Sequence, residues 1–464
     1  MGGLIGSLQI AVQSLLAEQG ALEVTTNNIA NANTPGYSRQ TPVFEEEPSF
    51  MEGSLVFGEG VSLQQVQSVR DNVLNLQLDQ ATGAQSQVNA YLGGMNQVAT
   101  IFNETQGAGL QNVISQFYNS FQQLSTDPTD TTLRQAVLTA GQNLATAFNQ
   151  ASASLGQIRT SLDQSLVQDV TQVNQLTSQI AALNPQVAAA QAAGESTGAL
   201  LDQRNELINQ LSGLVDTSVT DAGDGSVTVT TANGTALVVG NQSNALTTQL
   251  DPETGTQHVF SQGTDITESI QSGDLGGLIQ ARDQGVAQAQ TNLDNLAAGL
   301  ISSVNTQSAQ GFDLSGKAGG NFFVPFTASS SGSNAGAAAQ FAVAITDPSQ
   351  IAASSDGTAG SNGNALALAN LQNTALINGQ DPGDFYSNFV AGIGDQVSTA
   401  TAQQTATGLV VTQLQNQQQN ISGVSLDQEG ANLQLYQNAY NAAAEVVNVI
   451  NSLTQTTINM ATGA

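Results

Sequence analysis

The chain has no cysteine and no tryptophan, and its 464 residues include a single histidine, His258. Without cysteine there is neither a disulfide framework nor a thiolate metal site. One histidine alone also argues against a zinc site. A catalytic triad would have to recruit His258 from a predicted strand, so an ordinary strand or loop histidine is the favoured interpretation. We therefore expect no metal, no cofactor and no enzymatic activity.

Charged residues are also scarce, at 9% of the chain, and they are mostly of one sign, with 36 acidic against 7 basic residues. Such a chain cannot bind nucleic acid through phosphate contacts, and anionic lipid would repel it. No apolar run approaches the ~20 residues of a membrane span, so no membrane insertion is expected. No lysine or arginine precedes the N-terminal apolar stripe, which is periodic rather than continuous. This pattern predicts no secretory signal peptide.

Two acidic motifs invite a chemical interpretation. Asp221–Ser226 is similar to a calcium loop, but the acidic residues at its third and fifth positions and the closing glutamate are missing, so a tight turn is favoured. The pairs Asp251/Glu253 and Asp265/Glu268 could supply the two carboxylates of a glycoside hydrolase. Any acidic chain offers such pairs, and we assign no catalytic residue to them.

What the chain does contain is a long, almost uncharged amphipathic segment at each end. Apolar residues recur there at alternating four- and three-residue spacing, which is typical of a coiled-coil seam. The N-terminal seam is Leu4, Leu8, Ala11, Leu15, Glu18, Leu22, Thr25 and Ile29. The C-terminal seam is Leu433, Tyr436, Tyr440, Ala443, Val447, Ile450, Thr454 and Thr457. Further apolar residues widen the second helix beyond a two-helix seam and indicate more than one neighbour: Val446, Val449, Leu453 and Met460.

The free energy gained by packing one apolar stripe on one partner does not offset the entropy cost of ordering such a helix. Ordering a backbone costs about 1–2 kcal/mol per residue. Burying each large apolar side chain returns only about 1.5–3 kcal/mol, and each stripe holds a handful of them. We therefore expect ends that are loose in the monomer and ordered in an assembly.

The whole pattern predicts a mainly α-helical fold with a smaller β-rich middle domain. Segments 1–32 and 426–464 are predicted to pair as a coiled-coil stalk. Segments 33–213 and 364–425 form a helical, rod-like domain that begins with a loop and a hairpin. Segment 214–363 is predicted to be a looped-out, β-rich outer domain with a helix near 284–308.

Local signals refine this division. Short extended runs predict strands at 41–44, 54–57, 322–326 and 341–345. Asp127 and Pro128 suit the N-cap and first residue of a helix. Asn184-Pro185 predicts a break between two helices.

The loop that follows the first helix is dense in special residues. Asn27 and Asn28 stand where side-chain amides can cap a helix end, and Asn31 tolerates turn geometry. Pro35-Gly36 forces a turn, after which large side chains are expected to project towards a partner. An ordinary helix–turn is the alternative, but the density of specific residues favours an interface. The predicted assembly interface is Leu4, Leu8, Leu15, Leu22, Asn27, Asn28, Ile29, Asn31, Gly36, Tyr37, Arg39, Gln40, Leu433, Tyr436, Tyr440, Val447, Ile450 and Leu453.

This loop also carries a family resemblance. Residues 27–37, NNIANANTPGY, resemble the N-terminal motif of flagellar rod, hook and hook-associated proteins, and the continuation to Gln40 is similar to the hook-associated members. Leu-Leu-Asp-Gln-Arg at 200–204, GDLGGLIQAR at 273–282 and QQQNISGVSLD at 417–427 are also similar to that family. The stretch between Phe326 and Asn364 is shorter than in familiar members, which implies that their outermost insertion is reduced or absent.

The resemblance implies a structural role at the junction between the flagellar hook and filament. It implies self-association of the terminal helices in a ring or helical tube. The implied partners are the hook protein, a second junction protein (hook-associated protein 3) and an export chaperone on the C-terminal helix. The implied location is extracellular, on the bacterial flagellum, after type III export without a cleaved signal peptide. An extracellular coiled-coil adhesin, or an enzyme housed in residues 215–362, is the alternative.

Overall fold

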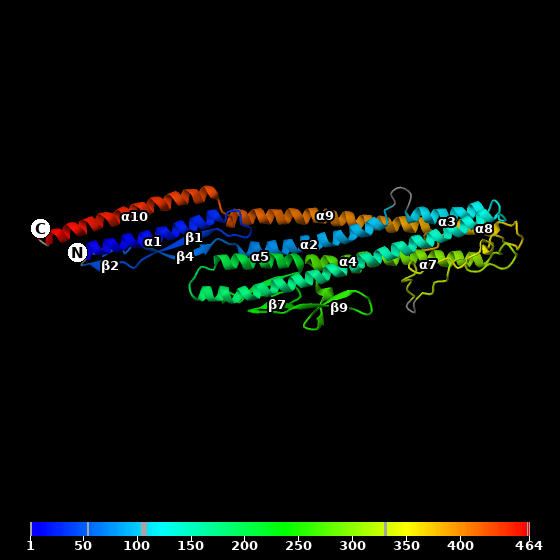
Figure 1. Ribbon diagram of the computed structural model, residues 1–464, viewed down its shortest axis with the longest axis horizontal. Coiled ribbons are helices and arrows are strands. Elements are labelled where there is room, and N and C mark those ends of the chain that lie inside the picture. Colours follow the sequence, from blue (N-terminus) through cyan, green and yellow to red (C-terminus); the bar gives the residue numbers. More distant parts are fainter. Residues whose placement is uncertain (1, 53–54, 104–108, 329–331, 462, 464) are drawn as a thin grey trace.

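Long helices run along almost the whole length of the molecule (Figure 1). The computed structural model describes residues 2–52, 55–103, 109–328, 332–461 and 463. Both ends of the chain lie at the same end of this elongated shape (Figure 1). The mainly helical fold with paired terminal helices and a smaller β-containing middle is confirmed. Among the described residues, no helix is both long and apolar enough to cross a membrane.

The α-helices in chain order are α1 Gly2–Ala30, α2 Asn72–Ile101, α3 Leu110–Leu124, α4 Thr131–Ala192, α5 Gly198–Leu214, α6 Gly273–Gln280, α7 Ala287–Ala309, α8 Gly363–Asn370, α9 Pro382–Ser422 and α10 Leu426–Ala461. A π-helical segment, Ala281–Val286, joins α6 to α7 without a break. Short 3-10 turns occupy Thr267–Ser269, Pro348–Gln350 and Leu371–Asn373.

The strands are β1 Gln40–Glu46, β2 Phe50–Glu52, β3 Leu55–Phe57, β4 Val61–Ser68, β5 Ser218–Asp221, β6 Val227–Thr230, β7 Ala236–Val239, β8 Gln242–Ser243, β9 Leu246–Leu250, β10 Gln257–Ser261 and β11 Thr264–Asp265. All pairings are antiparallel, in the sheet orders β1-β4, β2-β3, β5-β6-β7-β8 and β11-β10-β9. The predicted strand at 41–44 lies within β1. For the predicted strand at 54–57, Ser54 is outside the described residues and the remainder is β3.

The stalk consists of α1 and α10 lying side by side, with the β1–β4 hairpin packed against α1 (Figure 1). All eight residues of the α1 seam are at least partly covered, and in the α10 seam only Tyr440 counts as exposed. The close approach of helix and hairpin requires a small residue, because a Cβ at Gly20 would collide with the Leu63 side chain. The seams read from the sequence therefore face inward.

The rod consists of α2 along α9, with α4 and α5 beside them and α3, α7 and α8 at the end far from the stalk (Figure 1). That far end encloses an aromatic cluster in which Phe117, Phe121, Phe322, Phe323 and Phe341 are almost fully buried. The ring centroids of Phe323 and Phe341 are 4.7 Å apart in an edge-to-face arrangement. One continuous core of buried apolar residues extends from here along the rod and into the strands.

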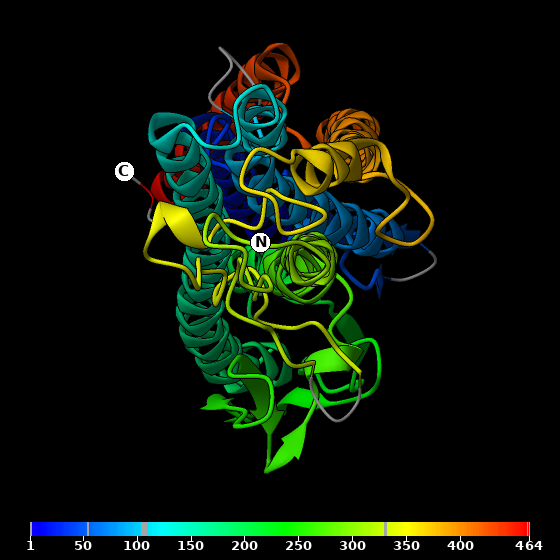
Figure 2. The same cartoon turned by 90° about the vertical axis from the view of Figure 1, so that its right-hand side faces the viewer.

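The sheets of the middle region lie on one side of the helices, against α4, in both views of the molecule (Figures 1 and 2). Side chains of α4 bind them through their backbone. Asn174 donates to the Leu246 carbonyl and accepts from its amide, both at 2.8 Å. Asn184, fully buried, donates to the carbonyls of Val227 and Gly240. Because one core joins these strands to the rod, the boundary between rod and outer domains stays a prediction.

Two predicted helix ends are wrong. The helix does not break at Asn184-Pro185, since α4 continues to Ala192. A proline inside a helix costs about 3 kcal/mol, and here the burial of its neighbours and the Asn184 hydrogen bonds to the strands offset that cost. At the other end, Asp127 does not cap α4. The N-cap is Asp130, whose carboxylate accepts from the amides of Thr132 and Leu133.

In the middle region one prediction is extended and another needs correction. The helix expected near 284–308 corresponds to α7, and α6 with the π-helical segment continues it back to Gly273. The glycines of this extension weaken the helix signal but permit contact: a Cβ at Gly277 would meet the Gln87 carbonyl of α2, and one at Gly285 would meet the Met95 sulfur. The strands expected at 322–326 and 341–345 form only an isolated bridge between Phe323 and Val343. Their phenylalanines were an aromatic core signal rather than a strand signal.

Candidate assembly interface

The seam residues predicted to mediate assembly are already used within the chain. Leu4, Leu8, Leu15, Leu22 and Ile29 of α1 are half-buried in the stalk, and Leu433, Tyr436, Val447 and Ile450 of α10 are half-buried or buried. The Tyr436 ring packs on the Phe44 ring of β1, with centroids 6.5 Å apart. The seam therefore holds α1, α10 and the hairpin together within one copy.

A second set of apolar side chains on the same two helices remains exposed. On α10, Leu435, Val446, Val449, Leu453 and Met460 follow the spacing of a further seam. Leu453 of the predicted interface belongs to this set, whereas Tyr440 lies on the inner seam and is 37% exposed. The exposed fractions are large: 65% for Ile5, 63% for Leu16, 62% for Leu435 and 71% for Met460. Val12 of α1 is also exposed. We call Ile5, Val12 and Leu16 of α1 and these five residues of α10 the outer stripe.

The Asn27–Gln40 loop folds back on the end of α1 instead of projecting from it. Asn28 is buried and pairs with the Gln40 backbone in both directions, accepting from its amide at 2.9 Å and donating to its carbonyl at 2.8 Å. The Tyr37 hydroxyl donates to the Asn28 side-chain oxygen at 2.8 Å and lies 3.0 Å from that of Asn27. The Asn31 amide donates to Asn27. These motif residues thus fix the course of the chain from α1 into β1.

The tyrosine is held in its protonated, donating form. Burial, together with the nearby carboxylates of Asp202 and Glu429, raises the pKa of Tyr37 to about 12. Gly36 before it has φ of +76°, the left-handed region that favours glycine, and a Cβ there would come within 3.2 Å of the Glu206 carboxylate. The backbone of this turn thus favours glycine at position 36, and its hydrogen bonds use the hydroxyl of Tyr37.

A buried ion pair fastens the loop to α5. Asp202 accepts from the Ser38 amide at 3.1 Å and from the Ser38 hydroxyl at 2.7 Å. The same carboxylate forms a salt bridge of 2.8 Å with Arg70, at the end of β4. Arg70 also donates to the Gly198 carbonyl at the start of α5. Asp202 and Arg70 were not among the predicted site residues.

The loop is also bound to the turn between α9 and α10. The Arg39 amide donates to the Ser422 carbonyl at 2.8 Å, and the Arg39 guanidinium donates to the Gln428 side chain at 3.1 Å. The Arg39 carbonyl accepts from the Val69 amide. We call this meeting point of α1, β4, α5, α9 and α10 the joint, because it is where the stalk is connected to the rod. Gln40, Arg39 and Tyr37 of the predicted interface all lie in it.

The element Leu-Leu-Asp-Gln-Arg on α5 contacts both the joint and the region where α4 meets the strands. Asp202 binds the joint, whereas Arg204, two residues later, donates to the Asn184 side chain of α4 at 3.1 Å and to the Gly225 carbonyl at 2.7 Å. The motif itself was visible in the sequence. Its pairing with Ser38, 164 residues away, was not, because nothing local to either segment signals the other.

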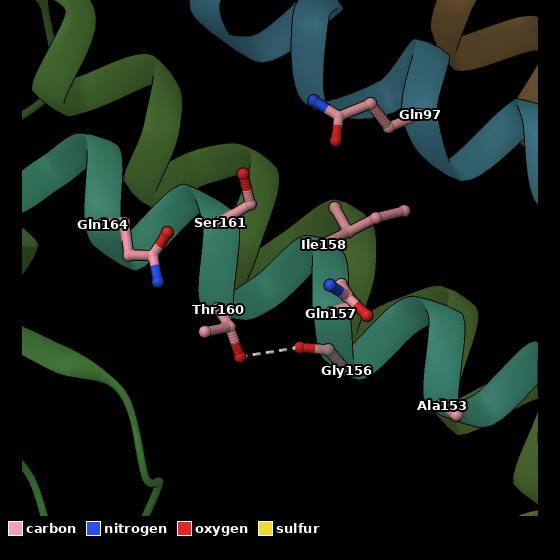
Figure 3. A pocket seen from close by; sticks show the side chains of 8 residues that line it. All are labelled: Gln97, Ala153, Gly156, Gln157, Ile158, Thr160, Ser161 and Gln164. Carbon is pink, nitrogen blue, oxygen red and sulfur yellow. Dashed lines mark hydrogen bonds between the residues drawn. The ribbon is translucent and has the colours of Figure 1, made fainter.

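The hollows of the molecule offer little chemistry. A groove of about 750 Å³ lies beside the joint, between α2, α5 and the end of α9, with Asp79, Glu206 and Asp221 in its walls. Burial raises the pKa of Asp79 to about 6. A smaller hollow between α2 and α4 is lined by uncharged side chains, among which Thr160 donates to the Gly156 carbonyl at 3.0 Å (Figure 3). In the described part of the chain, no group of acidic, histidine or cysteine residues is placed to hold a metal.

The lone histidine lies on β10, as the strand pattern predicted. Its Nδ1 is 2.7 Å from an Asp265 oxygen and its Nε2 is 3.9 Å from an Asp251 oxygen. Asp251 and Asp265, from the two predicted carboxylate pairs, are thus brought to the same imidazole on the edge of a small sheet. Both are also used in turn hydrogen bonds, to Thr254 and Thr267.

The sequence of this chain is similar to those of flagellar proteins. Residues 95–323 match the family described as "Flagellar hook-associated protein FlgK helical domain", and residues 8–37 match the family "Flagella basal body rod protein". The chain is 32% identical to Flagellar hook-associated protein 1 of Bacillus subtilis, with 97% of each chain covered. It is 28% identical to the protein of that name from Escherichia coli, over 97% of this chain and 98% of the relative.

The fold has a solved counterpart. The flagellar hook junction protein FlgK from Burkholderia pseudomallei is similar, with a TM-score of 0.67 at 22% identity, over 75% of this chain and all of that one. The matches favour a structural part of the flagellum over the adhesin alternative. The curated relatives match 97% of the chain. The chain belongs to the flagellar hook-associated protein 1 family and is a structural component of the bacterial flagellum.

Proposed function

We propose that copies of this chain associate through the outer stripe of the stalk and so form the junction between hook and filament. The observation that carries this proposal is that α1 and α10 cover their first seam within one copy and still expose a second apolar stripe. Exposed apolar patches on soluble proteins mark interaction surfaces. Neighbouring copies with the same stripe are the occupants that match it in chemistry and length.

The charges of the stalk suit close packing of many copies. The two helices contain five acidic residues and no lysine or arginine: Glu18, Glu23, Asp427, Glu429 and Glu445. A stalk with more acidic residues would repel its neighbours in a ring or helical tube. The uncharged outer stripe avoids that repulsion where contact is closest.

The partners in this proposal are the hook protein on one side and hook-associated protein 3 on the other, with a chaperone covering α10 before flagellar type III export. The protein is then extracellular, and it supports no catalysis. An export chaperone suits a helix whose outer stripe has no cover in a single copy. The outermost insertion of the family would be reduced here. In support, the alignment with the Escherichia coli relative extends over 541 positions, more than the 464 residues of this chain.

A matched pair of substitutions tests the proposal. Leu435→Asp places a charge in the outer stripe, and Leu250→Asp makes the same change on β9, where the leucine is equally exposed (62% and 61%). We expect Leu435→Asp to abolish motility in a complemented deletion strain, leaving hooks without filaments and filament protein in the medium. Leu250→Asp should restore motility. Normal filaments with Leu435→Asp would contradict the proposal.

Truncation provides the second test. Deleting residues 1–30 or 431–464 should leave a soluble rod that still unfolds cooperatively, measured by circular dichroism, but no longer joins hook to filament. The rod retains its own buried core, so its folding does not depend on the stalk. A truncated chain that still assembles would remove the stalk from the mechanism.

A further inference from the structure

Glu18 is an acidic residue inside the seam between α1 and α10. It occupies a core position of the N-terminal heptad pattern and is half-buried. Its Oε2 atom is shielded from solvent and has no hydrogen-bond partner among the described residues. A buried, unpartnered carboxylate oxygen is costly, because ionisation there removes water without supplying a donor.

No cation compensates the carboxylate. The only basic residue between the start of α1 and the end of β4, or within α10, is Arg39, and its guanidinium is bonded to Gln428. The titratable groups on α10 are Asp427, Glu429, Tyr436, Tyr440 and Glu445. Those of the hairpin and of the segment that connects its strands are Glu45, Glu46, Glu47, Glu52 and Glu59. All of these groups are neutral or negative, so each one that is charged disfavours a negative Glu18.

Other properties point in the same direction. Burial raises the pKa of Glu18 above its ordinary value. Burial also raises the pKa of Tyr436 on the facing helix, and the charges of Glu18 and Glu429 add to that rise. The side chains of Glu18 and Tyr436 therefore interact across the seam that closes the stalk.

We propose that Glu18 makes closure of the stalk pH-sensitive, so that α1 and α10 pair more tightly when this carboxyl group is protonated. An acid whose pKa is higher in the paired state binds more protons there. Pairing is then strongest below the ordinary glutamate pKa and weakens as the pH rises through the higher value. Above this raised pKa, the stalk opens more readily. In the proposed function, contacts with further copies then hold the stalk closed. The consequence of this pH dependence for assembly rests on the proposed function, whereas the test of the pH dependence itself does not.

The test uses the full chain as a monomer. Because the chain has no cysteine, spin labels at Gln9→Cys and Asn451→Cys, both on exposed positions of the stalk, report specifically on its closure. Pulsed electron spin resonance measures the ratio of paired to open stalks between about pH 3.5 and 8, a range that brackets the ordinary glutamate pKa of roughly 4.3 and the region above it. We expect this ratio to fall as the pH rises, by about tenfold for each unit by which pairing raises the pKa.

Glu18→Gln should keep the ratio high and independent of pH. Glu23→Gln, on an exposed turn of the same helix where its carboxylate accepts from Gln19, is the matched control and should follow the wild type. A pH response that survives in Glu18→Gln, or that Glu429→Gln abolishes instead, would overturn the proposal, as would a flat response in the wild type. The measurement needs no assembly, so failure of the junction function leaves its outcome intact.

Discussion

The rod and the stalk consist of the same kind of long helix, yet they bury their side chains to different depths. In the rod, large residues such as Phe117, Phe148 and Phe323 have no exposed surface. In the stalk, the buried apolar residues are mostly small, namely Ala11, Ala17, Ala21, Val24, Ala443 and Ile450. The rod has the core of an independent domain, whereas the stalk is stabilised only partly by its own contacts. In the proposed assembly, contacts with neighbouring copies would supply the rest of its stability.

The joint explains how two such different regions remain in register. Its hydrogen bonds are directed to backbone groups, to side-chain amides and to one buried carboxylate, so they fix orientation rather than add apolar area. The stalk is therefore held in a defined direction even where its own packing is thin. Five substitutions separate the contributions of rod, joint and stalk.

Phe323→Ala should have the largest effect, because it empties the centre of the aromatic cluster. The ring lies within 5.4 Å, centroid to centroid, of Phe117, Phe322 and Phe341. We expect a loss of about 3–5 kcal/mol in the free energy of unfolding, measured by urea denaturation. Phe326→Ala, on a side chain that only borders the core, is the control and should lose far less. Equal losses would mean that the rod core is not organised around this cluster.

Asp202→Asn should have the next largest effect, confined to the joint. Removing the charge leaves Arg70 partly buried without its counter-ion, which costs about 2–3 kcal/mol. Trypsin provides the readout, since the chain has few basic residues and two of them, Arg39 and Arg70, lie in the joint. Cleavage at these two should accelerate relative to the exposed Arg159 on α4. Glu206→Gln, one turn further along α5, removes a charge outside the ion pair and should leave the cleavage pattern unchanged.

Two neighbouring substitutions on α10 distinguish the inner seam from the outer stripe. Ile450→Ala, at a position only 5% exposed, should destabilise the free stalk by about 2 kcal/mol, seen as faster amide hydrogen exchange in α1 and α10. Leu453→Ala, at a position 49% exposed, should change exchange in the monomer by less than about 0.5 kcal/mol but weaken assembly. If the two variants behaved alike in the monomer, the division of α10 into two faces would be wrong.

Asp79→Asn should have the smallest effect and the opposite sign. Burial raises the pKa of Asp79 to about 6, so the folded chain holds a proton there that the unfolded chain releases near pH 4. The wild type therefore loses stability as the pH rises from about 4 to 6, and the asparagine variant does not. With allowance for solvent, we expect a gain of about 1 kcal/mol at pH 7.5 and none at pH 4, measured by urea denaturation. Asn209 can still donate to the new side chain.

The sequence by itself determined the helical stalk, its two faces and the family. Heptad spacing is a local property, so Leu4 to Ile29 and Leu433 to Thr457 could be assigned to inward faces without knowing their partners. The β-containing middle was visible for the same reason, in the alternation of Val227, Val229 and Leu237 with polar residues. The motif at 27–40 could be read as special because its residue types have restricted backbone preferences.

Only the tertiary structure decided where that motif binds. Tyr37 and Arg39 were expected to face a partner, which stays a prediction. Within one copy their segment forms the joint, because Ser38 meets Asp202 and Arg39 meets Ser422 from distant parts of the chain. The continuation of α4 through Pro185 was equally hidden, since it depends on strands that follow some 40 residues later. The close approach of the α6 glycine Gly277 to α2 was also invisible in the sequence. Spacing along the chain reports which face of a helix is apolar, whereas contacts between distant segments depend on geometry that no local pattern records.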